Sequence, residues 1–206
     1  MKSKRLYKPL LLAACCITPL ACPPAKEQPP VNQHEMRGYK DAPTRGSPCT
    51  LRISPITDGQ VGVLAVGMSV DALLRLCPSA NRVATTDVEG ASQALYYVPI
   101  TELDTIVAAI DSTHGREVIR SLSIEFLGPK DSRGIGVGNT LGQLRQRYPR
   151  LGTDDNEGRV YVWPMPDLGL SFALGIEAGS LDGRWRTNPG AIPDSTHVIE
   201  LLVRKS

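Results

Sequence analysis

The sequence lacks the features that mark most enzymes, metal proteins and nucleic-acid-binding proteins. Its formal net charge is only +2, and a near-neutral chain has no basic surface to attract nucleic acid. Its 3 histidines share no metal-ligand spacing. No G-x-S-x-G or H-E-x-x-H motif occurs along the chain. We therefore expect no nucleic-acid partner, no metal, no cofactor and no enzymatic activity.

The chain also lacks an apolar run long enough to cross a bilayer, but its start has the features of an export signal. A positive segment precedes the apolar stretch at residues 10–21. A small residue before a Cys resembles bacterial lipoprotein signals, in which that Cys becomes lipidated. Two cysteines fit this pattern. Cys22 follows an apolar stretch of full length. The four residues that end at Cys15, L-A-A-C, match the lipoprotein cleavage motif better, but only about five apolar residues precede them.

We favour residues 1–21 as the signal peptide and Cys22 as the lipidated residue. An ordinary cleaved signal is the alternative, although no Ala-x-Ala site lies nearby. Removing residues 1–21 takes away four basic and no acidic residues, so the net charge falls from +2 to −2. Membrane contact is then expected from the lipid. No Asp stands at or near the second position of the mature chain, directly after Cys22, where in the lipoprotein pattern an Asp signals retention at the inner membrane. We therefore expect an outer-membrane lipoprotein that faces the periplasm.

Residues 22–48 are expected to form the lipidated Cys and a tether. They are rich in proline and polar residues and contain almost nothing that could enter a core. Residues 49–206 are long enough to bury a core. We expect them to form one globular domain.

Cysteine is scarce beyond Cys22. Only Cys49 and Cys77 remain, in a compartment that favours disulfides. A bridge between them would close a loop of about 28 residues and contribute on the order of 3 kcal/mol. Two buried thiols are the alternative. A catalytic Cys is not expected, because no basic cluster accompanies either residue.

One stretch of the folded part occurs twice. Residues 66–78 read V-G-M-S-V-D-A-L-L-R-L-C-P, and residues 137–149 read V-G-N-T-L-G-Q-L-R-Q-R-Y-P. In each copy a Gly is followed by a Ser or Thr that can cap a helix, then by apolar residues three apart, then by a Pro. The pattern predicts short helices over residues 69–77 and 140–148.

Strand-like runs follow each helix. Strands are expected at residues 49–56, 94–98, 105–110, 117–127, 160–163, 168–174 and 197–204, with a polar loop at 78–92 and turns at 57–59, 112–115 and 154–158. The run 117–127 places Val118 and Leu122 on one face, with Arg120 interrupting it. The predicted fold class is α+β: one short helix followed by three antiparallel strands, twice, with the helices on one face of the sheet. The repeats would span about residues 49–128 and 129–206.

Residues 175–196 form the one segment that is hard to explain as scaffold. A connection of this length without periodicity is usually functional or disordered. Trp and Arg dominate binding hot spots, so these residue types favour a contact patch for a partner. The alternative is that Trp185 fills a gap at the sheet edge while the arginines cap carbonyls. The candidate partner-binding residues are Asp182, Arg184, Trp185 and Arg186.

The second half resembles part of a known lipoprotein family. The resemblance covers about residues 117–205 and is carried by G-V-G-N-T-L-x-x-L, the D-D-N run, L-S-F, G-x-W and the last strand I-E-L-L-V-R-K. It makes Gly138, Thr140, Asp155 and Trp185 family-like positions. The type member is an enterobacterial outer-membrane lipoprotein regulated by the envelope-stress sigma factor, and the family's biochemical function is not known. The resemblance implies an antiparallel α+β fold and an outer-membrane location, but it supplies no catalytic residue.

A looser resemblance concerns the tandem arrangement of short helix and sheet. It is similar to β-lactamase-inhibitor proteins and to the small lipoprotein of the outer-membrane assembly machinery, both of which bind proteins through an exposed sheet face. We therefore expect a non-enzymatic binding module for a periplasmic protein or a cell-wall component such as peptidoglycan. The alternative is a hydrolase of envelope polymers that uses carboxylates such as Asp182 and Glu177.

Overall fold

The computed structural model describes residues 49, 51, 53, 55–86, 92–113, 115–156, 158–186 and 188–206. The expected signal peptide, the expected lipidation at Cys22 and the expected tether lie outside these residues. In the part that is described, no helix has the length and apolar character needed to cross a membrane.

The described part of the chain is mostly β, with two short α-helices, one sheet of eight antiparallel strands and a small sheet of three strands. The predicted α+β class therefore overstates the helical part. The small sheet holds β1 (Ile56–Thr57), β2 (Gln60–Val61) and β3 (Leu64–Ala65), and the helices are α1 (Val70–Leu76) and α2 (Leu141–Arg147). The large sheet holds β4 (Asn81–Thr86), β5 (Ser92–Pro99), β6 (Thr105–Thr113), β7 (Arg116–Ile124), β8 (Leu151–Asn156), β9 (Arg159–Pro164), β10 (Leu170–Glu177) and β11 (Val198–Val203).

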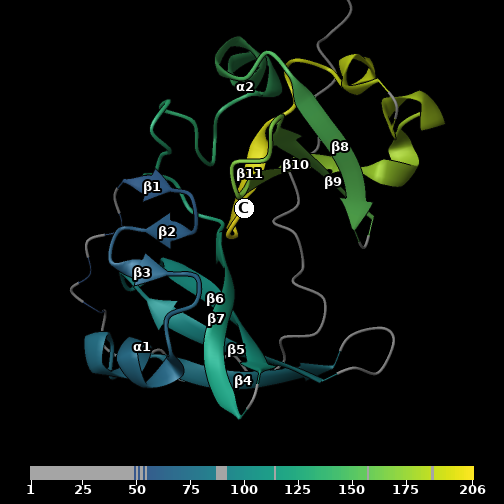
Figure 1. Ribbon diagram of the computed structural model, residues 1–206. Helices are drawn as coiled ribbons and strands as arrows, with labels where there is room; N and C mark the ends of the chain where they lie inside the picture. The colour runs from purple at the N-terminus through teal and green to yellow at the C-terminus, as the bar shows by residue number, and fades with distance from the viewer. Residues whose placement is uncertain are drawn as a thin grey trace, which may run out of the picture. The chain divides into compact units, whose positions relative to one another are not determined.

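The large sheet consists of two groups of four strands that meet at its centre. Its order is β4-β5-β6-β7-β11-β10-β9-β8, so each helix is followed by four strands rather than the three that were predicted. The two groups join where β7 pairs with β11, and Figure 1 shows β4–β7 below this joint and β8–β10 above it. The register at the joint is Leu201↔Ile124, Leu202↔Ser123 and Val203↔Leu122.

Both helices begin and end where the repeated stretch predicts. Ser69 caps α1 by accepting a hydrogen bond from a first-turn amide at 3.2 Å. Thr140 caps α2 in a capping box, in which the Gln143 side chain accepts from the Thr140 amide at 2.9 Å. Pro78 and Pro149 follow the two C-caps and prevent either helix from continuing.

Three predictions about strands are wrong. The described residues of 49–55 are not in a strand, and only Ile56–Thr57 pairs there, as β1. The polar loop expected after Pro78 contains β4. The acidic turn expected at 154–158 is largely strand, because Asp154 and Asp155 belong to β8. Both missed strands are edges of the sheet, where one side needs no partner and apolar alternation is weak.

A β-bulge explains why the predicted faces of β7 were partly wrong. The register with β6 shifts between Ala109 and Ile110, so that Ala109 pairs with Ser121 but Ile110 pairs with Ile119. The extra residue is Arg120, which is exposed. Ile119 therefore enters the core in place of Val118.

The hydrophobic core lies between one face of the large sheet and the helices. Val70 and Leu73 of α1 and Leu141 and Leu144 of α2 are buried against it. Alternate residues of the strands complete this helix-covered face. They include Val98, Ile106, Ala108, Leu122, Ile124, Val160, Val162, Phe172, Leu174, Leu201 and Val203.

Candidate functional site

The opposite side of the large sheet, which we call the helix-free face, carries the strongest candidate site. It holds the residues that alternate with the core residues and pair side by side across neighbouring strands. One row crosses β5, β6, β7, β11 and β10, and a second crosses β11, β10, β9 and β8. The first row is Tyr97, Val107, Ser123, Leu202 and Ser171, and the second is Glu200, Ala173, Tyr161 and Asp154.

Small residues form the floor of this face. Ala173 is 0% exposed and Ser171 is 1% exposed. Neither residue belongs to the hydrophobic cluster on the helix-covered face, so larger neighbours on their own face must cover them. Arg204 is one such neighbour, and its Nη2 donates to Ser171 Oγ at 2.6 Å. The face therefore has a low floor of small side chains with longer side chains lying over it.

A buried carboxylate lies near the centre of this face. Glu200 is 7% exposed, and a buried charge is stable only when it is paired and hydrogen-bonded. Ser123 Oγ donates to one carboxylate oxygen at 2.7 Å. Arg159 Nη1 and Tyr161 OH donate to the other, at 3.0 Å and 3.2 Å. Glu200 thus links β11 to β7 on one side and to β9 on the other.

The neighbours of Glu200 reach solvent. The Arg159 side chain is 49% exposed, and its Nη1 also lies 3.5 Å from Oε1 of Glu125. Burial is the main cause that raises the pKa of Tyr161 to about 12, and the nearby negative charge of Glu200 is the second. The Tyr161 hydroxyl therefore stays protonated and acts as a donor at neutral pH. The centre of the face thus presents an arginine and a tyrosine whose positions are fixed by a buried acid.

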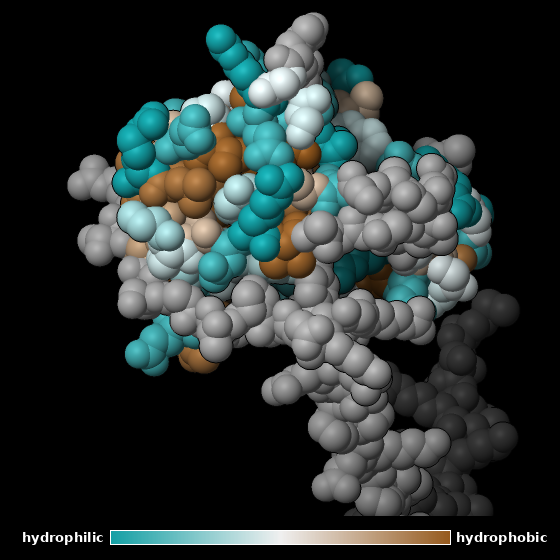
Figure 2. Space-filling view, turned by 90° about the horizontal axis from the view of Figure 1, so that it is seen from below, coloured by the Kyte–Doolittle hydropathy of each residue, from teal (hydrophilic) through white to brown (hydrophobic). Residues whose placement is uncertain are grey.

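Exposed leucines lie at one end of the sheet. Leu103 is 81% exposed and Leu127 is 72% exposed. Leu103 precedes β6 and Leu127 follows β7; because Ile106 pairs with Ile124, both leucines lie at the same end. Hydrophobic side chains also reach the surface between hydrophilic ones in the view from below (Figure 2).

The loop predicted to form a contact patch is largely structural. It contains three short 3-10 turns, η1 (Ala178–Ser180), η2 (Gly183–Arg186) and η3 (Pro189–Ala191). Its last part binds α2, because Leu141 N donates to Thr196 O at 2.7 Å and Gly142 N donates to Asp194 O at 2.9 Å. The Arg145 side chain also holds it, through Asp194 and the Ile192 carbonyl.

Trp185 is 0% exposed and belongs to the hydrophobic core. Its carbonyl accepts from Thr153 Oγ1 of the edge strand β8 at 3.1 Å. The structure thus places the Trp185 ring in the core rather than on the surface, in agreement with the alternative in which this residue fills a gap at the sheet edge. The sequence left both interpretations of Trp185 open, because a single Trp in a segment without periodicity gives no sign of whether its ring packs inward or faces solvent.

The other three predicted partner-binding residues are exposed, but they do not converge. Asp182 pairs with Arg184 two residues along, and this hydrogen bond holds the pKa of Asp182 below its usual value. Arg186 Nη2 instead lies 3.1 Å from Asp155 Oδ2 on β8, and its guanidinium covers the Trp185 ring at 4.8 Å. The loop thus covers the β8 edge of the sheet.

Glu177 and Asp182, the carboxylates proposed for a hydrolase, lack the surroundings of a catalytic acid and base. Glu177 is exposed at the end of β10. Asp182 is bound to Arg184, and a carboxylate with a lowered pKa is a poor proton donor at neutral pH. The structure instead brings Glu125 and Glu200 to one nitrogen of Arg159.

Cys49 and Cys77 form a disulfide, with Cα atoms 5.3 Å apart. This separation lies within the usual range for a bridge. Cys49 N also donates to Pro99 O at 2.8 Å, and Cys77 is the C-cap of α1. The bridge therefore joins the start of the described chain to the first helix.

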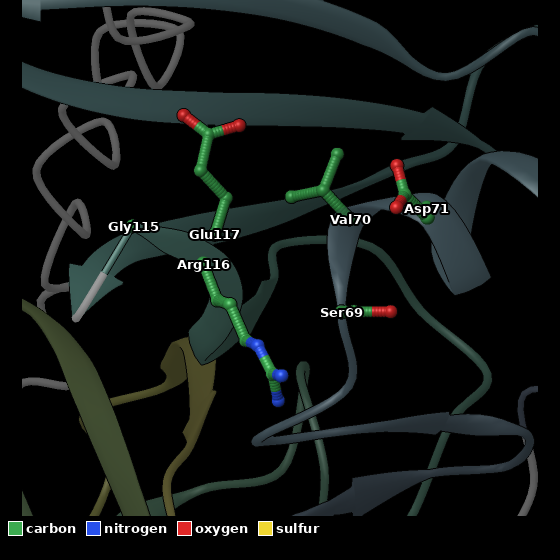
Figure 3. Close-up of a pocket in the computed structure, with 6 residues that line it drawn as sticks. All are labelled: Ser69, Val70, Asp71, Gly115, Arg116 and Glu117. Atoms are coloured by element: carbon green, nitrogen blue, oxygen red, sulfur yellow. The ribbon is translucent and has the colours of Figure 1, made fainter.

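A polar pocket of about 550 Å³ lies between the start of α1 and the start of β7. In Figure 3, Arg116 and Glu117 point to opposite sides of β7, as alternation along a strand requires. Glu117 is already paired with Arg82 at 2.7 Å. The pocket thus lacks convergent groups. Elsewhere among the described residues, no group of three or more His, Cys, Asp or Glu could hold a metal ion.

Sequence reasoning missed Glu200, although a signal was present. The last strand reads V-I-E-L-L-V, and an acid inside such an apolar strand is unusual unless it has partners. Its partners, Ser123, Arg159 and Tyr161, come from β7 and β9. Only the strand order brings them together.

Comparison with known proteins supports the fold. No protein-family model matches the chain, and no curated protein is similar to it in sequence. The structure is similar to the crystal structure of the uncharacterized protein yfeY from Escherichia coli, with a TM-score of 0.51 and 15% sequence identity. The similarity covers 74% of this chain and 100% of that chain, so it extends well beyond residues 117–205. At this identity the likeness concerns the fold alone.

Proposed function

We propose that this chain is a non-enzymatic binding module of the bacterial envelope that engages a periplasmic protein through its helix-free face. One observation carries the proposal: Glu200 is buried on a sheet face that no described helix covers, beneath partly exposed Arg159 and Tyr161. A buried, fully bonded acid at such a place holds the arginine and the tyrosine in fixed positions. Fixed aromatic and arginine side chains are typical of binding hot spots.

The apolar content of the face supports the same function. An antiparallel sheet that meets only water on one side usually carries polar residues there. Here Leu95, Val107 and Leu202 are half-buried on that face. The exposed Leu103 and Leu127 extend apolar surface at the end of the same strands. Apolar surface of this kind, rimmed by polar groups, is typical of protein interaction sites.

The proposal includes the anchor inferred from the sequence. Lipidation of Cys22 would hold the module at the outer membrane, facing the periplasm, on a proline-rich tether. Tethering raises the local concentration of a binding module near its target, so a modest intrinsic affinity is sufficient. Mass spectrometry of the isolated protein tests the anchor, because an unmodified N-terminus or a lipid on Cys15 contradicts it.

We also infer that the two halves arose by duplication. Each half has one capped helix followed by four antiparallel strands. In each half the residue that caps the helix forms a β-bridge at the last strand: Ser69 with Val118 in β7, and Thr140 with His197, which directly precedes β11. The inference requires the two halves to superpose with these residues aligned.

A hydrolase of envelope polymers is the second candidate, supported by the meeting of Glu125 and Glu200 at Arg159. Glycoside hydrolases usually use two carboxyl groups that lie close together as their catalytic residues. Purified wild-type protein and the Glu200→Gln variant should be compared on peptidoglycan. Release of soluble fragments by the wild type alone would favour the hydrolase over the binding module.

The binding module is tested by placing a photo-crosslinking amino acid at Val107 or at Leu202 in cells. The matched control is Gln146, which is exposed on α2, on the other side of the sheet. We expect the two positions on the helix-free face to give the same discrete protein adduct, and Gln146 to give none.

The adduct must also depend on the face itself. With the crosslinker at Val107, the change Leu202→Lys should remove the adduct while the melting temperature and the amount of protein stay near those of the parent. Equal adducts from Gln146, or adducts unaffected by Leu202→Lys, would contradict the proposed face. Cosedimentation with peptidoglycan, without any protein adduct, would assign the partner to the cell wall instead.

A further inference from the structure

A second cavity lies on a different part of the molecule and has no role in the proposed function. It has a volume of about 280 Å³ and lies where the loop before α2, the end of α2 and the connection from β9 to β10 meet. Residues lining it include Arg133, Tyr148, Arg150, Met165, Pro166 and Leu168. Cationic and apolar side chains thus line one small space.

Arg133 is held rigidly at this cavity. Its backbone N–H donates to Asp131 Oδ1 at 2.8 Å, and its Nη1 donates to the Arg147 carbonyl at 2.6 Å. Its guanidinium lies 4.5 Å from the centre of the Tyr148 ring. Tyr148 OH in turn donates to Asp131 Oδ2 at 2.6 Å. Asp131 is 5% exposed, so a buried acid fixes both the tyrosine and the arginine above it.

The cationic groups at the cavity retain most of their hydrogen-bonding capacity. A guanidinium has five N–H donors. Among the described residues, Arg133 uses one of these donors and Arg150 uses none. Among the described residues, neither nearby carboxylate forms an ion pair with these arginines. Asp131 is bound by Tyr148 and by backbone amides, and Asp167 accepts from Gly169 N at 2.8 Å.

The other wall is apolar and partly open. Met165 is 46% exposed, which is high for a large hydrophobic side chain, and Pro166 and Leu168 follow it along the same connection. Ligand pockets typically combine apolar walls with a few fixed polar groups. Planar guanidinium groups match the geometry of carboxylate and phosphate oxygens. A volume of about 280 Å³ lies just below the range for drug-sized ligands, which points to a small one.

We propose that this cavity binds a carboxylate or phosphate carried on a short apolar body, with the anion on Arg133 and Arg150 and the apolar body against Met165, Pro166 and Leu168. The proposal is independent of the helix-free face, because none of these residues lies in its two rows. A free amphiphilic acid and the head of a membrane lipid share this chemistry. The head group and the apolar part are therefore tested separately.

The test is a titration of the full chain with octanoate, octyl phosphate and octan-1-ol, below the concentrations at which they form micelles. Methyl-labelled methionine gives only four NMR signals, because the chain has 4 Met residues, and the Met165→Leu variant identifies that of Met165. We expect octanoate or octyl phosphate to shift the Met165 signal and leave that of Met68 unchanged. Octan-1-ol should bind at least about tenfold more weakly, since its neutral hydroxyl cannot form an ion pair or a bidentate pair with a guanidinium.

Arg150→Gln is the decisive variant, because its side chain has no partner among the described residues and the fold should not depend on it. It should weaken binding about tenfold, the effect of one charge-assisted hydrogen bond. Arg75→Gln, which changes an exposed arginine on α1, is the matched control and should bind like the wild type. Equal binding of octan-1-ol and octanoate overturns the proposal. So does equal binding by the two variants, or no shift of Met165 at millimolar ligand. A shift by octyl phosphate alone supports it and assigns the head group to phosphate.

Discussion

Gly67 and Gly138 hold equivalent positions, each in the turn three residues before a helix. Their φ angles are +89° and +88°. The Gly67 N–H donates to Ile119 O at 2.7 Å, and the Gly138 N–H donates to Val198 O at 2.9 Å. Each glycine thus attaches the chain ahead of a helix to the last strand of its half. The positive φ explains why a glycine stands at this place in both copies of the repeated stretch.

The first prediction concerns these two glycines. Gly67→Ala should lower the free energy of unfolding by about 1–2 kcal/mol, the cost of a left-handed conformation for a residue with a Cβ. The new Cβ meets nothing within 4 Å, so backbone strain alone is measured. At Gly138 it would meet Leu127 Cδ2 at 2.6 Å, but that side chain is exposed and can move. Gly138→Ala should therefore cost a similar amount.

Urea unfolding followed by circular dichroism gives both values. Gly179→Ala is the control, because its φ is not in the left-handed range and its Cβ also meets nothing. It should change stability by less than about 0.5 kcal/mol. If Gly67→Ala unfolds at the same urea concentration as Gly179→Ala, the glycines are not needed for this turn.

The second prediction concerns Trp185. Because its side chain is fully buried in the core, Trp185→Ala should lower the free energy of unfolding by about 3–5 kcal/mol. Its indole Nε1 has no hydrogen-bond partner among the described residues, so Trp185→Phe should cost clearly less. Arg184→Ala, at an exposed side chain on the same turn, is the matched control. Equal stability of Trp185→Ala and Arg184→Ala would show that the ring is not a core residue.

The third prediction concerns the disulfide. Replacing both Cys49 and Cys77 with Ser should lower the free energy of unfolding by about 3–4 kcal/mol, as the chain-entropy model gives for a separation of 28 residues. A reducing agent should destabilise the wild type by a similar amount and leave the double variant unchanged. Labelling of both thiols in the folded, oxidised protein would show instead that no bridge forms.

The fourth prediction is a loss of stability at high pH through Tyr161. The folded state raises the pKa of this tyrosine from about 10 to about 12, so above pH 10 the unfolded chain releases a proton that the folded chain retains. Stability is therefore complete below pH 10 and declines as the pH rises toward 12. After allowance for solvent screening, the decline from this residue should be about 1–2 kcal/mol.

The comparison of wild type with Tyr161→Phe isolates this effect. The variant lacks the ionisable group, so its stability should fall less between pH 10 and pH 12 when measured by urea unfolding at each pH. Tyr148, whose pKa is also raised by burial, remains in both proteins and contributes equally. Parallel pH profiles for the two proteins would show that Tyr161 is not protected by the fold.

The two helices could be predicted from the sequence because their signals are local. Ser69 and Thr140 lie within three residues of the amides that they cap, and Pro78 and Pro149 follow directly after the helices. The disulfide was also predictable, since few cysteines were available to pair. These predictions needed no knowledge of the strand order.

The strands at the edges and the arrangement of the helix-free face could not be predicted in this way. β4 reads N-R-V-A-T-T and β8 reads L-G-T-D-D-N, so neither carries the apolar alternation that marks a half-buried strand. The bulge opposite Ala109 changes which side chains of β7 face the core, and the interruption at Arg120 was its one sign in the sequence. The Glu200 cluster depends on β11 lying between β7 and β10, which is a property of the whole sheet.

The disulfide between Cys49 and Cys77 also has a mechanical consequence. Force applied to the chain before Cys49 is transmitted to the end of α1 through the disulfide bond. Without the bridge, the same force would first break the hydrogen bond from Cys49 N to Pro99 O and then detach the following residues one after another. The load then falls on a helix whose Val70 and Leu73 are anchored in the core. Resistance to such a pull is set by the rate of unfolding under force rather than by equilibrium stability. With the bridge closed, the segment between the two cysteines cannot lengthen under such a pull.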